Sequence, residues 1–178
     1  MRNVLIAFVS TGALLGAAGG ASAAPSTTTT TFTVSANVLK TCSVSATNLA
    51  FGNYTPGGGA LTSTSTVSVL CTNGTTFTAA LNGGSTTGGT VGQRLMAEGG
   101  GSGTLQYNLY TTAAHNIVWG DGTGTSATES GTGAGMAAAD AQSLTVFGQL
   151  PDSAANQAAP VTGATTAYSD TITVTVTY

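Results

Sequence analysis

The 178-residue sequence has very little charge of either sign. Lysine and arginine together number three and aspartate and glutamate six, so the net charge is −3. This scarcity excludes electrostatic binding to nucleic acid or to anionic lipid, because both need clustered Lys and Arg. It also leaves strand edges without the charges that normally prevent edge-to-edge pairing. Such a chain either aggregates or is built to pair its edges with a partner.

The sequence is equally poor in the residues of catalytic and metal sites. Its only histidine is His115, and it contains no G-x-S-x-G motif. The carboxylates are scattered, without the spacing of a glycosidase pair or a calcium loop. The glycine-rich stretches also lack the G-x-x-x-x-G-K phosphate loop. We therefore interpret His115 as a loop residue and Trp119 as a core or strand-end residue, and we predict no enzyme activity, no cofactor and no metal.

Residues 1–23 have the features of a secretory signal peptide. One positive charge at Arg2 precedes a short apolar run, and the small-residue sequence Ala21-Ser22-Ala23 follows it. We expect cleavage after Ala23. No other segment is long and apolar enough to cross a bilayer. The expected product is therefore exported, and no membrane insertion is expected after cleavage.

Cys42 and Cys71 are the only cysteines. In an exported protein an isolated pair most often forms a disulfide, and we predict one here. A thiol nucleophile or a metal-binding pair is the less favoured alternative, because the sequence has no C-x-x-C motif and only one histidine.

The segment TTTTTFTVSANVLKTC, residues 27–42, alternates strictly between apolar and polar residues. Phe32, Val34, Ala36 and Val38 share one face, while threonine, serine and asparagine occupy the other. A period of two predicts an extended strand with one buried face. The segment precedes Cys42 and so lies outside the loop that the disulfide would close.

The rest of the chain also predicts strands rather than helices. Leu49 and Phe51 mark one short segment and residues 117–119 begin another short strand, while longer strands are expected at residues 61–72, 75–81, 105–110, 143–150 and 168–178. Asn73-Gly74 predicts a hairpin that makes residues 67–72 and 75–81 antiparallel neighbours. Both Asn73-Gly74-Thr75 and Asn53-Tyr54-Thr55 match the N-glycosylation pattern, but we prefer to interpret them as turns. The predicted fold is an all-β sandwich.

Several motifs in this order resemble those of a known family. They are F-x-V-x-A-x-V ahead of the first cysteine, LAFGNY, SVLCT with the second cysteine, LQYNLYT, VWGDGTG, LTVFGQLP and the closing YSDTITVTVTY. The set resembles the spore coat protein U domain family, which includes the subunits of archaic chaperone–usher pili. The resemblance covers essentially all of the chain after the leader.

This resemblance implies an incomplete immunoglobulin-like β-sandwich that lacks its last strand. A periplasmic chaperone would fill the gap first, and at the outer-membrane usher the N-terminal extension of a neighbouring subunit would replace it. Carried onto this sequence, the donor segment is about residues 24–36, with Phe32, Val34 and Ala36 as its inserting side chains. The groove and the chaperone contact would involve four residues of the C-terminal strand: Ile172, Val174, Val176 and Tyr178.

The resulting prediction has three parts: a signal peptide at 1–23, a donor-strand extension at 24–36 and a β-sandwich domain at 37–178. The function it implies is a structural pilus subunit at the cell surface, polymerising by donor-strand exchange with a role in adhesion and biofilm formation. The alternatives are a secreted spore or cell-coat protein and a monomeric carbohydrate-binding β-sandwich.

Overall fold

A computed structural model describes residues 22–161 and 167–178. The predicted signal peptide lies outside the described residues up to position 21. Residues 22–41 contain no helix or strand. The remainder belongs to a compact unit, Asn37–Tyr178, that carries every described strand.

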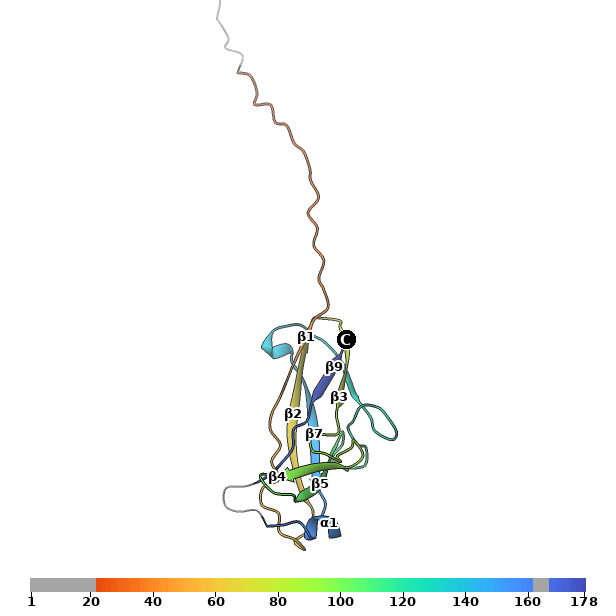
Figure 1. The fold of residues 1–178 in the computed structure, drawn as a ribbon. Coiled ribbons are helices and arrows are strands. Elements are labelled where there is room, and N and C mark those ends of the chain that lie inside the picture. Colours follow the sequence, from red (N-terminus) through yellow and green to blue (C-terminus); the bar gives the residue numbers. More distant parts are fainter. Residues whose placement is uncertain (1–21, 162–166) are drawn as a thin grey trace, which may run out of the picture. The chain divides into compact units, whose positions relative to one another are not determined.

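Two antiparallel sheets make up this unit (Figure 1). The large sheet has the order β1 (Cys42–Ala46), β2 (Leu61–Cys71), β7 (Gln142–Leu150), β5 (Thr104–Tyr110), β4 (Arg94–Glu98) and β8 (Tyr168–Ser169). The small sheet has the order β6 (Glu129–Thr132), β3 (Thr76–Leu81) and β9 (Val174–Thr177). The predicted all-β sandwich is confirmed.

Alternating side chains from both sheets form the core. Val67 and Val69 of β2 are almost wholly buried, as are Phe77, Ala79 and Leu81 of β3, while the residues that alternate with them are more exposed. Burying every second side chain is how a strand covers a core on one face and meets water on the other.

The predicted disulfide is present and joins the first two strands. Cys42 and Cys71 lie directly opposite each other in the β1–β2 pair, with their Cα atoms 4.1 Å apart. The bond therefore fixes β1 to β2, its only neighbour in the sheet.

The predicted hairpin at Asn73-Gly74 is wrong. β2 pairs with β1 and β7, whereas β3 pairs with β6 and β9, so the two strands belong to different sheets. The turn explains the difference: Gly74 has φ of 78°, but Asn73 is not among the described residues with positive φ. A two-residue type I′ hairpin needs positive φ at both central positions. The observed turn instead carries the chain from one sheet to the other.

Other differences concern short elements. β4 and β6 lie in stretches where no strand was predicted, and two short helical turns, η1 (Ala138–Asp140) and α1 (Ala154–Gln157), lie between predicted strands. Residues 117–119 make only isolated bridges, Tyr110 with Val118 and Trp119 with Ala127. The predicted C-terminal strand is divided between the two sheets, since β8 pairs with β4 and β9 with β3.

Arg94 is a buried cation that holds several loops together. Its guanidinium donates to the carbonyl oxygens of Asn82 (2.9 Å) and Trp119 (2.8 Å) and to the Asn108 side chain. Desolvation lowers the pKa of Arg94, but these acceptors compensate for part of its lost hydration. Trp119 is fully buried and donates its indole N–H to the Ala79 carbonyl at 3.0 Å. The sequence-based assignment of Trp119 to the core is confirmed.

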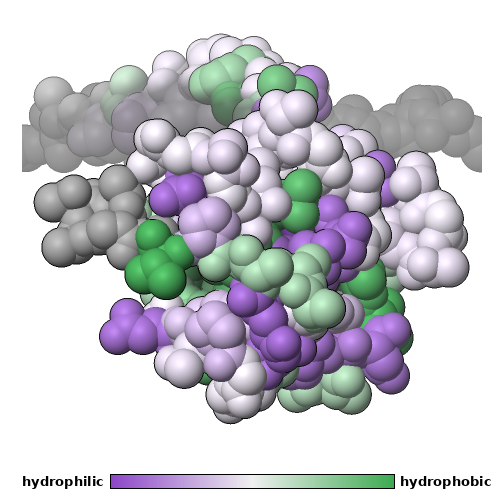
Figure 2. All heavy atoms as spheres, turned by 60° about the horizontal axis from the view of Figure 1, so that its bottom comes forward, coloured by the Kyte–Doolittle hydropathy of each residue, from purple (hydrophilic) through white to green (hydrophobic). Residues whose placement is uncertain are grey.

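The end of the sandwich that carries α1 is held by one carboxylate. Asp152 accepts hydrogen bonds from the Tyr54 hydroxyl and from the backbone amides of Gly57 and Gly59. These bonds lower the pKa of Asp152, while desolvation and the same carboxylate raise the pKa of Tyr54 to about 12. Figure 2 views this end and shows hydrophobic side chains only in small, separate patches among polar ones.

Candidate functional site

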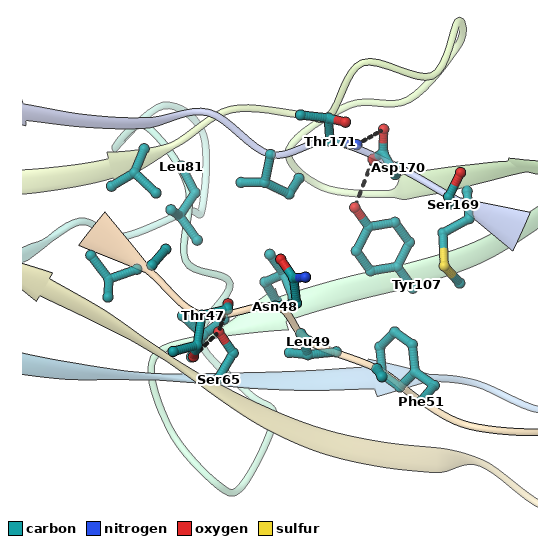
Figure 3. A pocket seen from close by; sticks show the side chains of 18 of the residues that line it. Thr47, Asn48, Leu49, Phe51, Ser65, Leu81, Tyr107, Ser169, Asp170 and Thr171 are labelled. Carbon is teal, nitrogen blue, oxygen red and sulfur yellow. Dashed lines mark hydrogen bonds between the residues drawn. The ribbon is translucent and has the colours of Figure 1, made fainter. Parts of the chain in front are cut away.

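A groove of about 580 Å³ runs between the two sheets (Figure 3). One wall is residues 46–51, which continue from β1, and the other is residues 168–174, which include β8 and the start of β9. Its floor consists of buried core side chains: Val67, Leu81, Tyr107, Leu109 and Val146. The groove therefore lies directly over the core, and the apolar side chains that are only partly buried, Leu49, Phe51, Ile172 and Val174, stand on its walls.

The first wall follows an edge strand that changes direction after Ala46. The ladder between β1 and β2 ends at the pair Ala46 and Val67. Beyond it, Thr47 still donates its backbone N–H to the Thr66 carbonyl, but the Thr47 hydroxyl takes the Thr66 N–H at 3.0 Å. The Thr47 hydroxyl thereby takes the place of a backbone carbonyl as the acceptor for the Thr66 N–H. After Ala46, the next residue that faces the groove floor is Leu49, three positions on, instead of the second residue expected in a regular strand.

Leu49 and Phe51 then lie against the large sheet where β7 has a glycine. A Cβ atom at Gly148 would come within 2.8 Å of Leu49 Cδ1 and 3.1 Å of the Phe51 ring. The Phe51 ring also meets Tyr107 edge to face, with ring centres 6.1 Å apart. The absence of a side chain at Gly148 therefore lets this wall pack closely on the sheet.

The second wall is the segment where the chain passes from the large sheet to the small one. Asp170 anchors the crossing: its Oδ1 atom accepts hydrogen bonds from the amides and hydroxyls of Ser85 and Thr86 and from the Thr171 amide. Its Oδ2 atom accepts the Tyr107 hydroxyl at 2.7 Å. Both oxygen atoms are thus engaged in holding the loop at 85–86, β5 and the C-terminal segment together.

The same bonds shift the ionisation of both partners. Burial disfavours the charged carboxylate, but hydrogen bonds from Tyr107, Ser85 and Thr171 outweigh it, so the pKa of Asp170 is lowered. The pKa of Tyr107 is raised, first by desolvation and then by its bond to Asp170. Asp170 is therefore ionised at neutral pH and Tyr107 is protonated, which suits a fixed structural hydrogen bond.

The lining of the groove is mainly apolar. Within the described ranges 22–161 and 167–178, His, Cys, Asp and Glu do not gather into any group of three that could hold a metal. No helix in that part of the chain is long and apolar enough to cross a membrane. His115 has a φ of 51°, meets the Tyr110 ring edge to face and is not among the residues that line the groove.

The four predicted C-terminal residues do not share one environment. Ile172 and Val174 line the groove, whereas Val176 pairs with Ala79 and packs against the core. Tyr178 is 54% exposed and borders a separate shallow depression with Thr76, Phe77 and Gly131. Only the first two therefore stand on the wall of this groove.

The predicted donor residues precede the compact unit. Phe32 and Val34 are 86% and 82% exposed, and Ala36 is exposed as well. Together with Val38 and Leu39 they form a run of apolar side chains without cover among the described residues.

Several residues that shape the groove were not predicted from the sequence. Leu49 and Phe51 were recognised only as a short apolar segment, and Tyr107 only as part of a strand. Asp170 was included only as part of the C-terminal strand, with no role of its own. The spacing Val44, Ala46, Leu49, Phe51 was the available signal, because its one interval of three marks the break in the edge strand.

The family model described as Spore Coat Protein U domain matches residues 28–175. The chain belongs to this family. Its match covers the whole sandwich up to Thr175, together with Phe32, Val34 and Ala36. None of the curated proteins compared with the chain is similar to it in sequence.

A solved structure has a similar fold. It is a chain of the CsuC–CsuE chaperone–tip adhesion subunit pre-assembly complex from the archaic chaperone–usher Csu pili of Acinetobacter baumannii. The TM-score is 0.52 at 23% identity, over 79% of this family member and 40% of that chain. The present chain thus spans less than half the length of the matching one, and the likeness describes the fold of the sandwich.

Proposed function

We propose that the protein is a structural subunit of a chaperone–usher surface pilus that polymerises by donor-strand exchange. The observation that carries the proposal is an apolar groove between the segment that continues edge strand β1 and the segment that leads into edge strand β9, in a chain that also has an uncovered apolar extension. β1 ends the large sheet and β9 ends the small one, so each presents one side without a strand partner in the described unit. A further strand between them would complete both sheets.

An inserted strand would pair with the free backbone groups at the edges of this groove and cover its apolar side chains. Edge strands present rows of backbone N–H and C=O groups that a new strand can pair with, and alternate side chains of that strand enter the groove. Residues 24–36 have the required alternation, with Phe32, Val34 and Ala36 on the entering face. Covering apolar surface contributes about 25 cal/mol per Å², before the cost of ordering the strand is subtracted.

The geometry of such a contact produces a filament. The extension of one subunit enters the groove of another, whose own extension remains available for the next. A head-to-tail contact of this kind does not close on itself unless its rotation happens to form a ring. The low charge of the chain, which would otherwise promote aggregation, then serves controlled edge pairing.

The partners follow from the same feature. Partly buried apolar side chains such as Leu49, Phe51 and Ile172 line the walls of the groove, and a periplasmic chaperone would cover them until an outer-membrane usher places the subunit in the fibre. The similar fold within a chaperone–subunit complex supports this assignment. The carboxylate of Tyr178, at the end of the C-terminal strand, is the proposed anchor point for the chaperone. Export to the cell surface, adhesion and biofilm formation are the corresponding biological roles.

Deletion of residues 24–36 tests the proposal. We expect the truncated subunit to bind the chaperone and accept a wild-type extension, but to fail to insert behind another subunit. A full-length control with Phe32→Ser and Val34→Ser keeps the length and removes only the entering side chains. Polymerisation of the truncated protein would refute the donor role. A stable, monodisperse monomer without chaperone would favour a self-complete carbohydrate-binding sandwich instead.

A further inference from the structure

The two cysteines of the disulfide differ in exposure. Cys71 is 0% exposed and belongs to the hydrophobic core cluster, whereas Cys42 is only partly buried and packs against that cluster. Cys42 begins β1, the edge strand of the large sheet, while Cys71 ends β2, which lies between β1 and β7. Of the two sulfur atoms, only that of Cys42 can therefore lie within reach of a reagent that meets the folded protein.

A short glycine-rich strap covers Cys71. We give this name to residues 133–135, which follow β6. Gly133 donates its N–H to the Thr75 carbonyl at 2.8 Å, and Gly135 donates its N–H to the Cys71 carbonyl at 3.2 Å. A Cβ atom at Gly133 would come within 2.5 Å of the Cys71 carbonyl oxygen and 2.7 Å of the Cys71 Cβ atom. The lack of a side chain at Gly133 therefore lets the strap lie directly on Cys71.

Backbone pairing on both sides of the disulfide holds the two cysteines opposite each other. The β1–β2 register pairs Cys42 with Cys71 and continues through four further pairs to Ala46. On the other side, Thr72 donates its N–H to the Thr41 carbonyl at 3.0 Å, and the Thr72 hydroxyl accepts the Thr41 N–H at 3.3 Å. Two thiols held in this way would react with each other in an effectively unimolecular step.

The segment just ahead of Cys42 is open to a protein partner. Residues 37–41 are all exposed and form no helix or strand, and Val38 and Leu39 are 90% and 79% exposed. Proteins recognise an extended segment of this kind through backbone hydrogen bonds and through pockets for its side chains. An enzyme that acts on Cys42 thus has an accessible peptide directly beside its target.

We propose that Cys42 is the thiol that a protein disulfide oxidoreductase engages, through contacts with residues 37–41, and that Cys71 is the thiol that releases the enzyme. Before the bond exists, the Cys42 thiolate attacks one sulfur of the enzyme's disulfide, and the enzyme's second sulfur leaves as a thiolate. The Cys71 thiolate then attacks the Cys42 sulfur, the mixed disulfide breaks, and the enzyme leaves reduced. Two electrons pass to the enzyme, and the two cysteine protons pass to water or to the enzyme's thiolates.

The same geometry decides where a reductant attacks the closed disulfide. A thiolate from outside forms a mixed disulfide with Cys42 and displaces Cys71 as a thiolate. Attack on Cys71 itself would first require the strap to move. Because Cys71 stays opposite Cys42, it attacks back and expels the reductant. The inference is independent of the proposed function, since it concerns the β1–β2 pair and its surroundings alone.

Trapping the mixed disulfide on the wild-type protein tests the order of attack. The full-length protein, purified with its chaperone, is treated with reduced glutathione, quenched with acid and alkylated. Fragmentation mass spectrometry then shows which cysteine carries glutathione. We expect Cys42 to carry it at least about tenfold more often than Cys71, and the two to become equal when urea unfolds the protein. Equal labelling of the folded protein, or a preference for Cys71, would overturn the proposal.

Two single-cysteine variants test the enzyme as partner. Cys71→Ser and Cys42→Ser lack the same bond and differ only in which thiol remains. The probe is a thioredoxin-like oxidase that keeps one cysteine of its C-x-x-C site, joined to thionitrobenzoate, whose release is coloured. We expect Cys71→Ser to release the colour at least about tenfold faster than Cys42→Ser, and the two to react alike in urea. Equal rates of the folded variants would contradict the role of Cys42.

A further substitution separates the enzyme from a small disulfide. Leu39→Ser, added to Cys71→Ser, should slow the reaction with the oxidase several-fold. Its reaction with dithionitrobenzoate, which releases the same colour, should stay unchanged. Slowing of both reactions, or of neither, would overturn the contact between the enzyme and residues 37–41.

Displacing the strap tests how Cys71 is protected. Gly133→Ala places a methyl group against Cys71 and should raise the share of glutathione on Cys71 several-fold. Gly92→Ala is the matched control, because its Cβ would meet no atom within 4 Å. The same ratio of labelling in Gly133→Ala and in wild type would show that the strap does not shield Cys71.

Discussion

Tyr107 and Asp170 lie 63 residues apart in the sequence and share a hydrogen bond of 2.7 Å in the groove. Tyr107 belongs to β5 in the large sheet, and Asp170 begins the crossing to the small sheet. The bond thus connects the floor of the groove with one of its walls. It defines the position of Ile172 and Val174, which follow Asp170 along that wall.

Replacing Tyr107 by phenylalanine should destabilise the sandwich while leaving its ring contacts intact. The variant loses one charge-assisted hydrogen bond, and we expect a loss of about 1–3 kcal/mol in the free energy of unfolding. Urea denaturation of the chaperone-bound subunit, compared with the wild-type complex, measures it. An unchanged midpoint would mean that Asp170 is held well enough by Ser85, Thr86 and Thr171.

Acid should weaken the same junction. The pKa of Asp170 is lower in the folded than in the unfolded chain, so its stabilisation is complete above the unfolded value and is lost as the pH falls through the folded one. The unfolded value is about 3.9, so the loss should begin near pH 4. We expect Asp170→Asn to be less stable than wild type at pH 7, with a difference that shrinks below pH 4. A constant difference over this range would assign the acid response to other carboxylates.

Arg94→Met should loosen the packing around Trp119. The substitution fills a similar volume but leaves the carbonyls of Asn82 and Trp119 without their donor. We expect about 2–4 kcal/mol of destabilisation. Trp119 is the only tryptophan, so its emission spectrum reports its burial directly. Arg94→Lys should recover little, because one ammonium group cannot reproduce the geometry of the guanidinium.

Breaking the disulfide should reduce accumulation of the exported protein. The bond closes a loop with a sequence separation of 29 and contributes roughly 3–4 kcal/mol on the chain-entropy model. We expect Cys42→Ser to lower the yield in the oxidising compartment and to make the yield insensitive to reductant. Equal yields of wild type with and without reductant would show that β1 stays in place without the bond.

Gly148→Ala should displace the wall formed by Leu49 and Phe51. The added methyl group collides with Leu49, and we expect the free energy of unfolding to fall by about 1–3 kcal/mol. We also expect the groove to bind a synthetic peptide of residues 24–36 more weakly. Gly92→Ala is the matched control, because its Cβ would meet no atom within 4 Å. Equal behaviour of the two variants would contradict the close packing at Gly148.

The sequence predicted the strands in which apolar and polar residues alternate over several positions. β2, β5 and β7 alternate over enough residues to be recognised, and each was expected within one or two residues of its position. β4 and β6 have four or five residues inside glycine-rich and threonine-rich stretches. Their strand conformation depends on pairing with β5 and β3, which local sequence does not encode.

The candidate groove was predictable only in outline. Alternation identified Ile172 and Val174, but it equally included Val176 and Tyr178, which the break at residues 170–173 places outside the groove lining. That break depends on Asp170 finding partners 63 to 85 positions away. Asn73-Gly74 is a strong local hairpin signal, but β2 and β3 pair with other strands in different sheets. Here long-range strand pairing, and not the local turn sequence, decides the structure.

The passage of the last strand segment from one sheet to the other has a consequence for biogenesis. β8 completes an edge of the large sheet and β9 an edge of the small one, and both lie within the final eleven residues. Neither sheet has its full set of strands until residues 168–177 are in place. A chain truncated before residue 168 would lack both β8 and β9, and we expect it to be open to proteolysis on both sheets.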